Sequence, residues 1–193
     1  WGALIELVNQ DYADLVTKKK YEPKSAAEQL FDRMDRASEK VGAVQRISSF
    51  EKPLQQELAA ALEKEARDML DEKHASYPDT LLGKTLVIEF ARGGAHGSAM
   101  PLKAPFGYEY SIAHLAPEIL EKAVVLYIWV APEESRRKNE ARADPNDPGS
   151  ILHHSVPLHV MMNDYGVCDM PHLEDTSDVS GTIAIKARGK TFH

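Results

Sequence analysis

The sequence predicts an α/β protein with a largely parallel sheet and helices on both faces of that sheet. Residues 124–130 (VVLYIWV) form a continuous apolar run, and residues 86–90 (LVIEF) form a shorter one. Helix-like segments lie between and after these runs, at residues 117–123 and 132–143. Apolar strands that are separated by helices are typical of a parallel sheet covered on both faces.

The whole chain, residues 1–193, is expected to form a single α/β domain, because this length is sufficient for one hydrophobic core. Residues 1–24 would be an N-terminal β-hairpin appendage. Apolar stretches at residues 3–8 and 13–17 flank the polar sequence NQDY there, which is typical of a turn. Residues 25–193 would be the core.

Two amphipathic helices are predicted in the first half of the chain. Ser25 precedes a helical pattern over residues 26–41, and Glu28 stands three residues after Ser25, as in a capping box. Pro53 begins a second helical pattern that runs to His74. The apolar side chains expected on the buried faces are Leu30, Phe31, Met34 and Ala37 in the first helix, and Leu54, Leu58, Leu62, Met69 and Leu70 in the second.

Shorter elements complete the expected order. A strand is predicted at residues 43–47, and a helix is predicted to begin near Pro157 and to end at Gly166. Residues 182–187 (TIAIKA) predict a last strand.

The composition excludes some classes of function. The formal net charge is −7 and the sequence pI is about 5.6, so most of the surface is expected to be acidic, which argues against nucleic-acid binding although local basic clusters stay open. Cys168 is the single cysteine, so the chain cannot form an internal disulfide. No apolar run approaches the roughly 20 residues that span a bilayer. We therefore expect a soluble, cytoplasmic protein without a membrane partner.

A polar site is expected where the 86–90 strand ends. Glu89 and Arg92 lie there, three residues apart, and Gly93 and Gly94 follow. Ligands of open parallel sheets bind beyond the carboxyl ends of the strands, and glycines let the backbone approach a ligand closely. Glu89 would orient or deprotonate an acceptor, and Arg92 would hold a phosphate through its planar guanidinium. The alternative is a buried ion pair between Glu89 and Arg92 that only fixes the loop.

A second group of cations follows the 124–130 strand. The segment PEESRRKNEAR predicts a helix that carries Arg136, Arg137 and Arg142. Cations beside a phosphate site would neutralise a transferring phosphoryl group. Alternatively, these arginines pair with glutamates of the same helix and form a solvated face.

Histidines crowd residues 153–172, and Cys168 lies among them. Histidine, cysteine and aspartate are metal-ligand types, so a metal site is one hypothesis for this cluster. The spacing contains no His-Glu-x-x-His pair, and the acids beside Cys168 disfavour a thiolate nucleophile. The histidines of the cluster are His153, His154, His159 and His172.

The order of these segments resembles the second half of P-loop kinases of the nucleoside and nucleotide kinase type. An apolar strand, an acid and an arginine are followed by a helix, a second apolar strand and a Pro-Glu-Glu helix with spaced arginines. The sequences FARGG, PEESRRKN and SILHHSVP also resemble uncharacterised bacterial proteins of this general kind. The resemblance implies that Glu89 and Arg92 engage the acceptor and that Arg136, Arg137 and Arg142 belong to a lid over the phosphates. It also implies ATP and Mg²⁺ as cofactors.

The phosphate loop of those kinases is not found in the chain. Gly83, Lys84 and Thr85 match the end of that motif, but Pro78 stands where a glycine is required. A predicted strand follows the triplet, whereas a phosphate loop leads into a helix N-terminus. The chain is therefore expected to be a fragment or a divergent member of this kind of protein.

The sequence favours a kinase-like or phosphate-ligand-binding protein that acts on a small molecule; whether it is an enzyme is left open, and phosphotransferase is the class considered. Two alternatives stay open. One is a non-catalytic module that serves assembly, either as a homo-oligomer or with a partner chain. The other is a metal-dependent hydrolase that uses the histidine cluster at residues 153–172.

Overall fold

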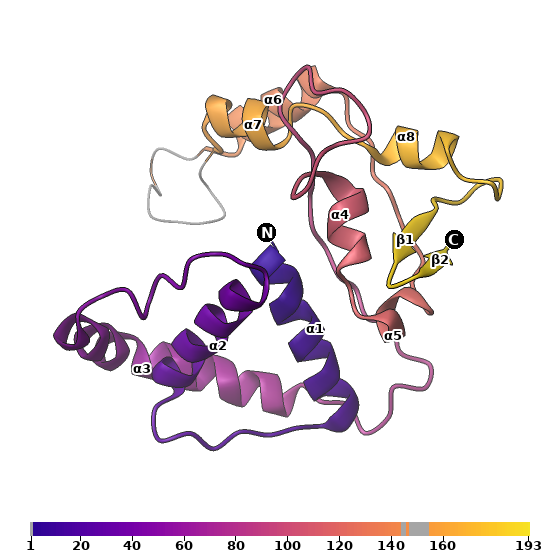
Figure 1. Ribbon diagram of the computed structural model, residues 1–193. Helices are drawn as coiled ribbons and strands as arrows, with labels where there is room; N and C mark the ends of the chain where they lie inside the picture. Colours follow the sequence, from indigo (N-terminus) through magenta and orange to yellow (C-terminus); the bar gives the residue numbers. More distant parts are fainter. Residues whose placement is uncertain (1, 144–145, 147–154) are drawn as a thin grey trace. The chain divides into compact units, whose positions relative to one another are not determined.

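The computed structural model describes residues 2–143, 146 and 155–193 (Figure 1). Within these residues the protein is mostly helical, and regular strands occur in one antiparallel hairpin near the C-terminus. The predicted P-loop kinase-like α/β fold with a largely parallel sheet is therefore wrong. The elements are α1 (Gly2–Thr17), α2 (Ala26–Lys40), α3 (Lys52–Ala75), α4 (Gly107–Ala113), α5 (Pro117–Leu120), α6 (Pro132–Ala141), α7 (Leu158–Asp164), α8 (Met170–Asp175), β1 (Ile185–Ala187) and β2 (Lys190–Phe192).

The segments that predicted strands take other structures. The N-terminal hairpin is wrong because α1 occupies that part of the chain as one continuous helix. Residues 86–90 and 124–130 have no regular secondary structure, and no backbone hydrogen bond joins them to another described segment. Residues 43–47 form an irregular segment with turns. Side chains that favour strands produce a sheet only where neighbouring strands supply hydrogen bonds.

The chain divides into two compact units, which are described separately. The first contains α1, α2 and α3 and comprises described residues 2–89 and 114–116. The second comprises described residues of 90–113 and 117–193, with the other helices and the hairpin. None of the helices in the described part of the chain has both the length and the apolar character needed to cross a membrane.

In the first unit, α2 begins and ends close to the predicted positions. Ser25 is the N-cap, and its Oγ accepts a hydrogen bond from Glu28 N at 3.1 Å. This bond satisfies one of the N–H groups that lack a partner at the start of a helix. After the C-cap Val41, Gly42 has a φ of +70°, which glycine adopts without steric strain.

Alanines form the buried centre of the contact between α2 and α3, and Leu30, Phe31 and Leu70 pack against them. Ala26 and Ala27 of α2 form one buried cluster with Ala59 and Ala66 of α3. Small side chains let two helices approach closely, so the interface needs few large residues. The burial of the predicted leucine face of α3 is correspondingly incomplete. Exposed fractions are 43% for Leu54, 43% for Leu62 and 63% for Met69, and Met34 of α2 is 42% exposed.

A carboxylate of α3 holds the start of α2. Glu63 Oε1 accepts a hydrogen bond from Ala26 N at 3.0 Å, and Oε2 accepts one from Ala27 N at 3.1 Å. The Ser25 hydroxyl and Arg67 also donate to this carboxylate, at 2.7 and 2.8 Å. The hydrogen bonds from Ala26 N–H, the Ser25 hydroxyl and Ala27 N–H lower the pKa of Glu63 to about 2.

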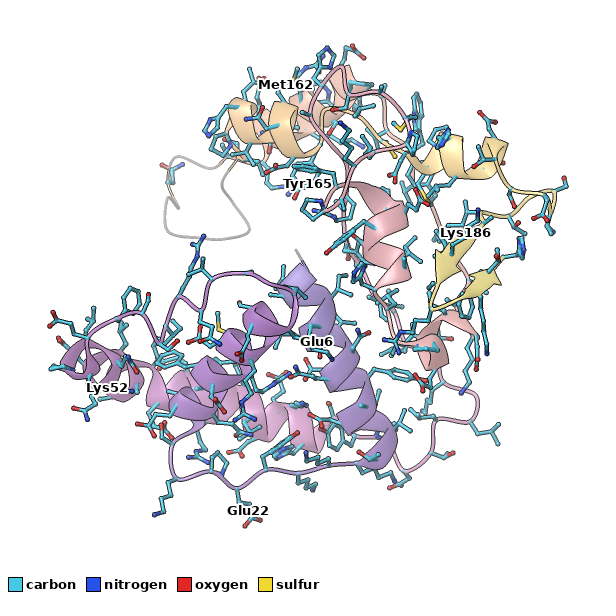
Figure 2. The ribbon with its side chains drawn as sticks, viewed as in Figure 1. Glu6, Glu22, Lys52, Met162, Tyr165 and Lys186 are labelled. Carbon is cyan, nitrogen blue, oxygen red and sulfur yellow. The ribbon has the colours of Figure 1, made fainter. Side chains whose placement is uncertain are left out.

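Charged side chains join α1 to α2. Glu6 of α1 accepts a hydrogen bond from Lys40 Nζ at 2.6 Å, and Glu6 is drawn on α1 in Figure 2. Arg33 of α2 donates to Asp11 at 2.7 Å. Next to Glu6, α1 buries Ile5, which is 3% exposed.

The second unit packs around α4, α8 and the hairpin. β1 pairs with β2 so that Ile185 lies opposite Phe192. Arg188 and Gly189 connect the strands with φ values of +50° and +76°, as in the two-residue turns that suit twisted hairpins. Only the last three residues of the predicted strand at 182–187 belong to β1. The buried apolar side chains of this unit are Ile112, Ile119, Leu120, Met170, Leu173, Ile185 and Ala187.

Replacement of Glu63 by glutamine is expected to remove a pH-dependent part of the stability of the first unit. The pKa of Glu63 is about 2 in the folded protein and near 4.5 for an ordinary glutamate. Its stabilising effect is therefore complete above pH about 4.5 and is lost as the pH falls towards 2. Thermal unfolding followed by circular dichroism between these pH values measures the effect.

Glu65→Gln is the matched control, because Glu65 is exposed on the same helix. The control should retain the pH dependence of the unmodified protein. Equal behaviour of the Glu63 and Glu65 variants would contradict the assigned cap.

Candidate functional site

The structure places Glu89 and Arg92 in different units. Glu89 belongs to the first unit and is exposed. Arg92 belongs to the second unit and is only 5% exposed. The role of Glu89 and Arg92 in holding an acceptor stays a prediction. Within the second unit, the hydrogen bonds of Arg92 indicate a structural role.

The Arg92 guanidinium binds polar groups of its own unit. Its Nε donates to the Ser111 hydroxyl at 2.7 Å, and a terminal nitrogen donates to the Pro105 carbonyl at 2.6 Å. Ser111 in turn donates to the Gly107 carbonyl at 3.0 Å. Burial lowers the pKa of Arg92, but a guanidinium stays charged at any physiological pH. The charge therefore ties the loop before α4 to α4 itself.

Gly93 and Gly94 allow two parts of the chain's own backbone to meet. Gly94 forms an isolated antiparallel bridge with Val167, with N···O distances of 2.9 and 3.1 Å. A Cβ on Gly93 would lie 2.6 Å from the Val167 carbonyl oxygen, so a side chain there would force the segments apart. Close approach of these glycines to a ligand stays a prediction.

Asp169 holds the start of α4 and was missed by sequence reasoning. Its carboxylate is buried and accepts hydrogen bonds from Tyr108 N at 2.8 Å and Glu109 N at 3.0 Å. Gly107 has a φ of +83°, and a Cβ at that position would overlap the carboxylate. Asp169 and Glu109 are 60 residues apart in the sequence, so no local sequence pattern reveals that Asp169 caps α4.

An aromatic contact attaches the middle of the 124–130 segment to the rest of the second unit. The ring of Tyr127 lies edge-on to that of Tyr108, with centroids 6.2 Å apart. The Tyr127 hydroxyl is 3.2 Å from Cys168 Sγ. Burial, followed by the hydrogen bond with Cys168, raises the pKa of Tyr127. Tyr127 is thus an anchor, and its hydroxyl stays protonated at neutral pH.

The predicted cations of α6 lie beside glutamates of the same helix. Arg137 donates two hydrogen bonds to Glu134, both at 2.7 Å, and Arg136 lies 3.4 Å from Glu133. Arg142 is exposed and follows the helix as its C-cap residue. The pairs match the alternative of a solvated face, and a role of these arginines over a phosphate stays a prediction.

The histidine cluster is only partly described. His153 and His154 lie outside the described residues, while His159 is exposed on α7 and His172 is half-buried on α8. Among residues 2–143, 146 and 155–193, no group of three histidine, cysteine or acidic side chains could hold a metal ion.

Among the described residues of the second unit, the 124–130 segment is the most exposed apolar feature. It runs as a long trace between α5 and α6 (Figure 1). Val124 is 95% exposed, Leu126 is 85% exposed and Ile128 is 75% exposed, whereas Tyr127 is 37% exposed. In the described chain no backbone N–H or C=O of this segment has a backbone hydrogen bond. The segment therefore combines apolar side chains with a main chain that is available for pairing.

Comparisons with known proteins give no assignment for these features. No protein-family model matches the chain, and no curated protein or solved structure matches it either.

Replacement of Arg92 by alanine is expected to destabilise the ligand-free protein by about 2–4 kcal/mol, because two charge-assisted hydrogen bonds are lost in a buried site. Thermal or urea unfolding without added ligand measures the change. Arg137→Ala is the control and should change stability by no more than about 0.5 kcal/mol, because Arg137 is exposed. Unchanged ligand-free stability of the Arg92 variant would show that its side chain does not hold the loop.

Proposed function

We propose that the protein is an interaction module that adds the 124–130 segment as a β-strand to the strand edge of another polypeptide chain. A second copy of this chain is the simplest such partner. The supporting observation is the exposed apolar segment whose main chain has no backbone hydrogen bond within the described residues.

An extended segment of another chain is the partner that best satisfies the backbone N–H and C=O groups of such a segment. Strand addition forms N–H···O=C bonds along the edge and uses alternate side chains for specificity. An exposed strand edge with apolar side chains is otherwise a site of uncontrolled association. The segment contains no charged residue, so no register places like charges opposite each other.

The two faces of the segment are not equivalent. Tyr127 packs on the rest of the second unit through Tyr108 and Cys168 and anchors its side of the segment at this point, while Trp129 on the same side is 67% exposed. Leu126 and Ile128 alternate with Tyr127 along the chain and are largely exposed. A partner therefore has to supply both a strand at the edge and apolar side chains over Leu126 and Ile128.

An assembly role is favoured over phosphate binding by the state of the cations. Arg92 donates to Ser111 and Pro105, and Arg137 donates to Glu134. A phosphate at these positions would have to compete with bonds that the chain already makes. Kinase-like activity with ATP and Mg²⁺ stays a prediction from the sequence.

Replacement of Ile128 by proline is expected to weaken association by at least about tenfold, because proline removes a backbone N–H that strand pairing needs. Sedimentation of the purified full chain over a concentration series measures the association constant. Amide exchange over residues 124–130 provides the second measurement, since these amides should become protected as the oligomer forms.

Ile128→Val is the matched control and should associate like the unmodified chain, because valine keeps both the N–H and the β-branched side chain. Thermal stability of the monomer should be the same in both variants, since Ile128 is 75% exposed. A chain that stays monomeric at millimolar concentration, or a proline variant that associates normally, would refute strand pairing between copies.

A further inference from the structure

The first unit contains a cavity of about 690 Å³ between its helices. α2 packs against both α1 and α3, and the cavity lies beside this pair of contacts. All its lining residues belong to the first unit. A volume of this size is typical of sites for small organic molecules. Apolar residues that line it include Val8, Leu15, Leu30, Met69, Leu70 and Leu86.

Four charged residues form a hydrogen-bonded network at the polar part of the cavity, and three of them, Asp11, Arg33 and Lys73, line it. Lys73 Nζ donates to Asp11 at 2.7 Å and to Asp14 at 2.6 Å, which links α3 to α1. Arg33 of α2 donates to the same Asp11 oxygen at 2.7 Å. The Tyr21 hydroxyl donates to Asp14 at 2.9 Å. Two cations and two carboxylates therefore balance each other.

This balance decides the charge of a suitable ligand. Burial disfavours the charge on Lys73, but the Asp11 and Asp14 carboxylates outweigh burial and raise the pKa of Lys73. Each cation of the network already donates to a carboxylate, so a charged ligand would bring a charge without a counterion. Glu72 and Glu89 also line the cavity and would repel an anion.

We propose that this cavity binds an uncharged, mainly apolar small molecule of a size to fill about 690 Å³. The apolar body would contact Leu15 and Leu70, and a polar end would hydrogen-bond to the side of the network formed by Asp11 and Lys73. Burial of the exposed side chains of Met69 and Leu86 would add a hydrophobic contribution of about 25 cal/mol per Å² covered. This site is separate in sequence and in unit from the 124–130 segment.

Fluorescence titration of the purified full chain with N-phenyl-1-naphthylamine, a neutral apolar probe, tests the proposal. Saturable binding at one site is expected. Leu15→Trp should raise the Kd by about tenfold or more, because the larger side chain occupies part of the cavity. Val16→Trp is the matched control on the same helix, since Val16 is 50% exposed and does not line the cavity, and its Kd should be unchanged.

A second pair of variants on α3 covers the case in which Leu15→Trp fails to fold. Met69→Glu should weaken probe binding by placing an unpaired charge at the cavity, whereas Leu62→Glu should not, and both positions are exposed. The anionic probe 1-anilinonaphthalene-8-sulfonate should bind at least about tenfold more weakly than the neutral probe.

Any one of the following results would overturn the proposal. The first is the absence of saturable binding of the neutral probe to the unmodified chain. The second is equal loss of binding in the cavity variants and their controls, or equal affinity for the anionic probe. The third is loss of binding on Ile128→Pro, which would place the probe at the 124–130 segment; retained binding in a variant that no longer associates would separate this site from the proposed assembly function.

Discussion

The need of each buried backbone N–H for a partner is the constraint on which the rest of the structure depends. Helices satisfy this need internally, except in their first turn. Here the first turns of α2 and α4 receive acceptors from remote carboxylates. Glu63 of α3 accepts from Ala26 N and Ala27 N of α2, and Asp169 accepts from Tyr108 N and Glu109 N of α4. One acid therefore both completes a helix and joins it to another part of its unit.

The 124–130 segment differs from these capped helices, because its backbone groups have no partner of this kind within the described residues. Its main chain has no backbone partner in the described residues, and its most exposed side chains are apolar. Water can satisfy the main chain of the isolated protein, but the exposed Val, Leu and Ile side chains then remain hydrated at an unfavourable free energy. Pairing with another strand would give the main chain hydrogen-bond partners and would also cover the apolar side chains. The proposed function follows from this combination more than from any single exposed residue.

Local signals predicted α2, α3 and α6, because capping residues, proline at a first turn and helical periodicity lie within each segment. Local signals of this kind do not predict a sheet, because a strand forms only when it pairs with neighbours that are remote in the sequence. Residues 86–90 and 124–130 have the composition of strands but no paired neighbour. α1 was missed because its polar residues NQDY were interpreted as a turn, although they continue one helix. Asp169 is likewise remote from the helix that it caps.

The candidate phosphate site shows why residue type alone does not define a site. Arg92 has the chemistry of a phosphate ligand, yet it donates to Ser111 and Pro105 and lies among buried residues. Lys73 is a cation beside a cavity, yet two carboxylates accept its hydrogen bonds. Such cations already have partners, whereas the apolar surfaces of the cavity and of the 124–130 segment remain uncovered. Because hydrophobic association needs no displacement of an existing bond, the structure is better suited to recognising apolar groups than anions.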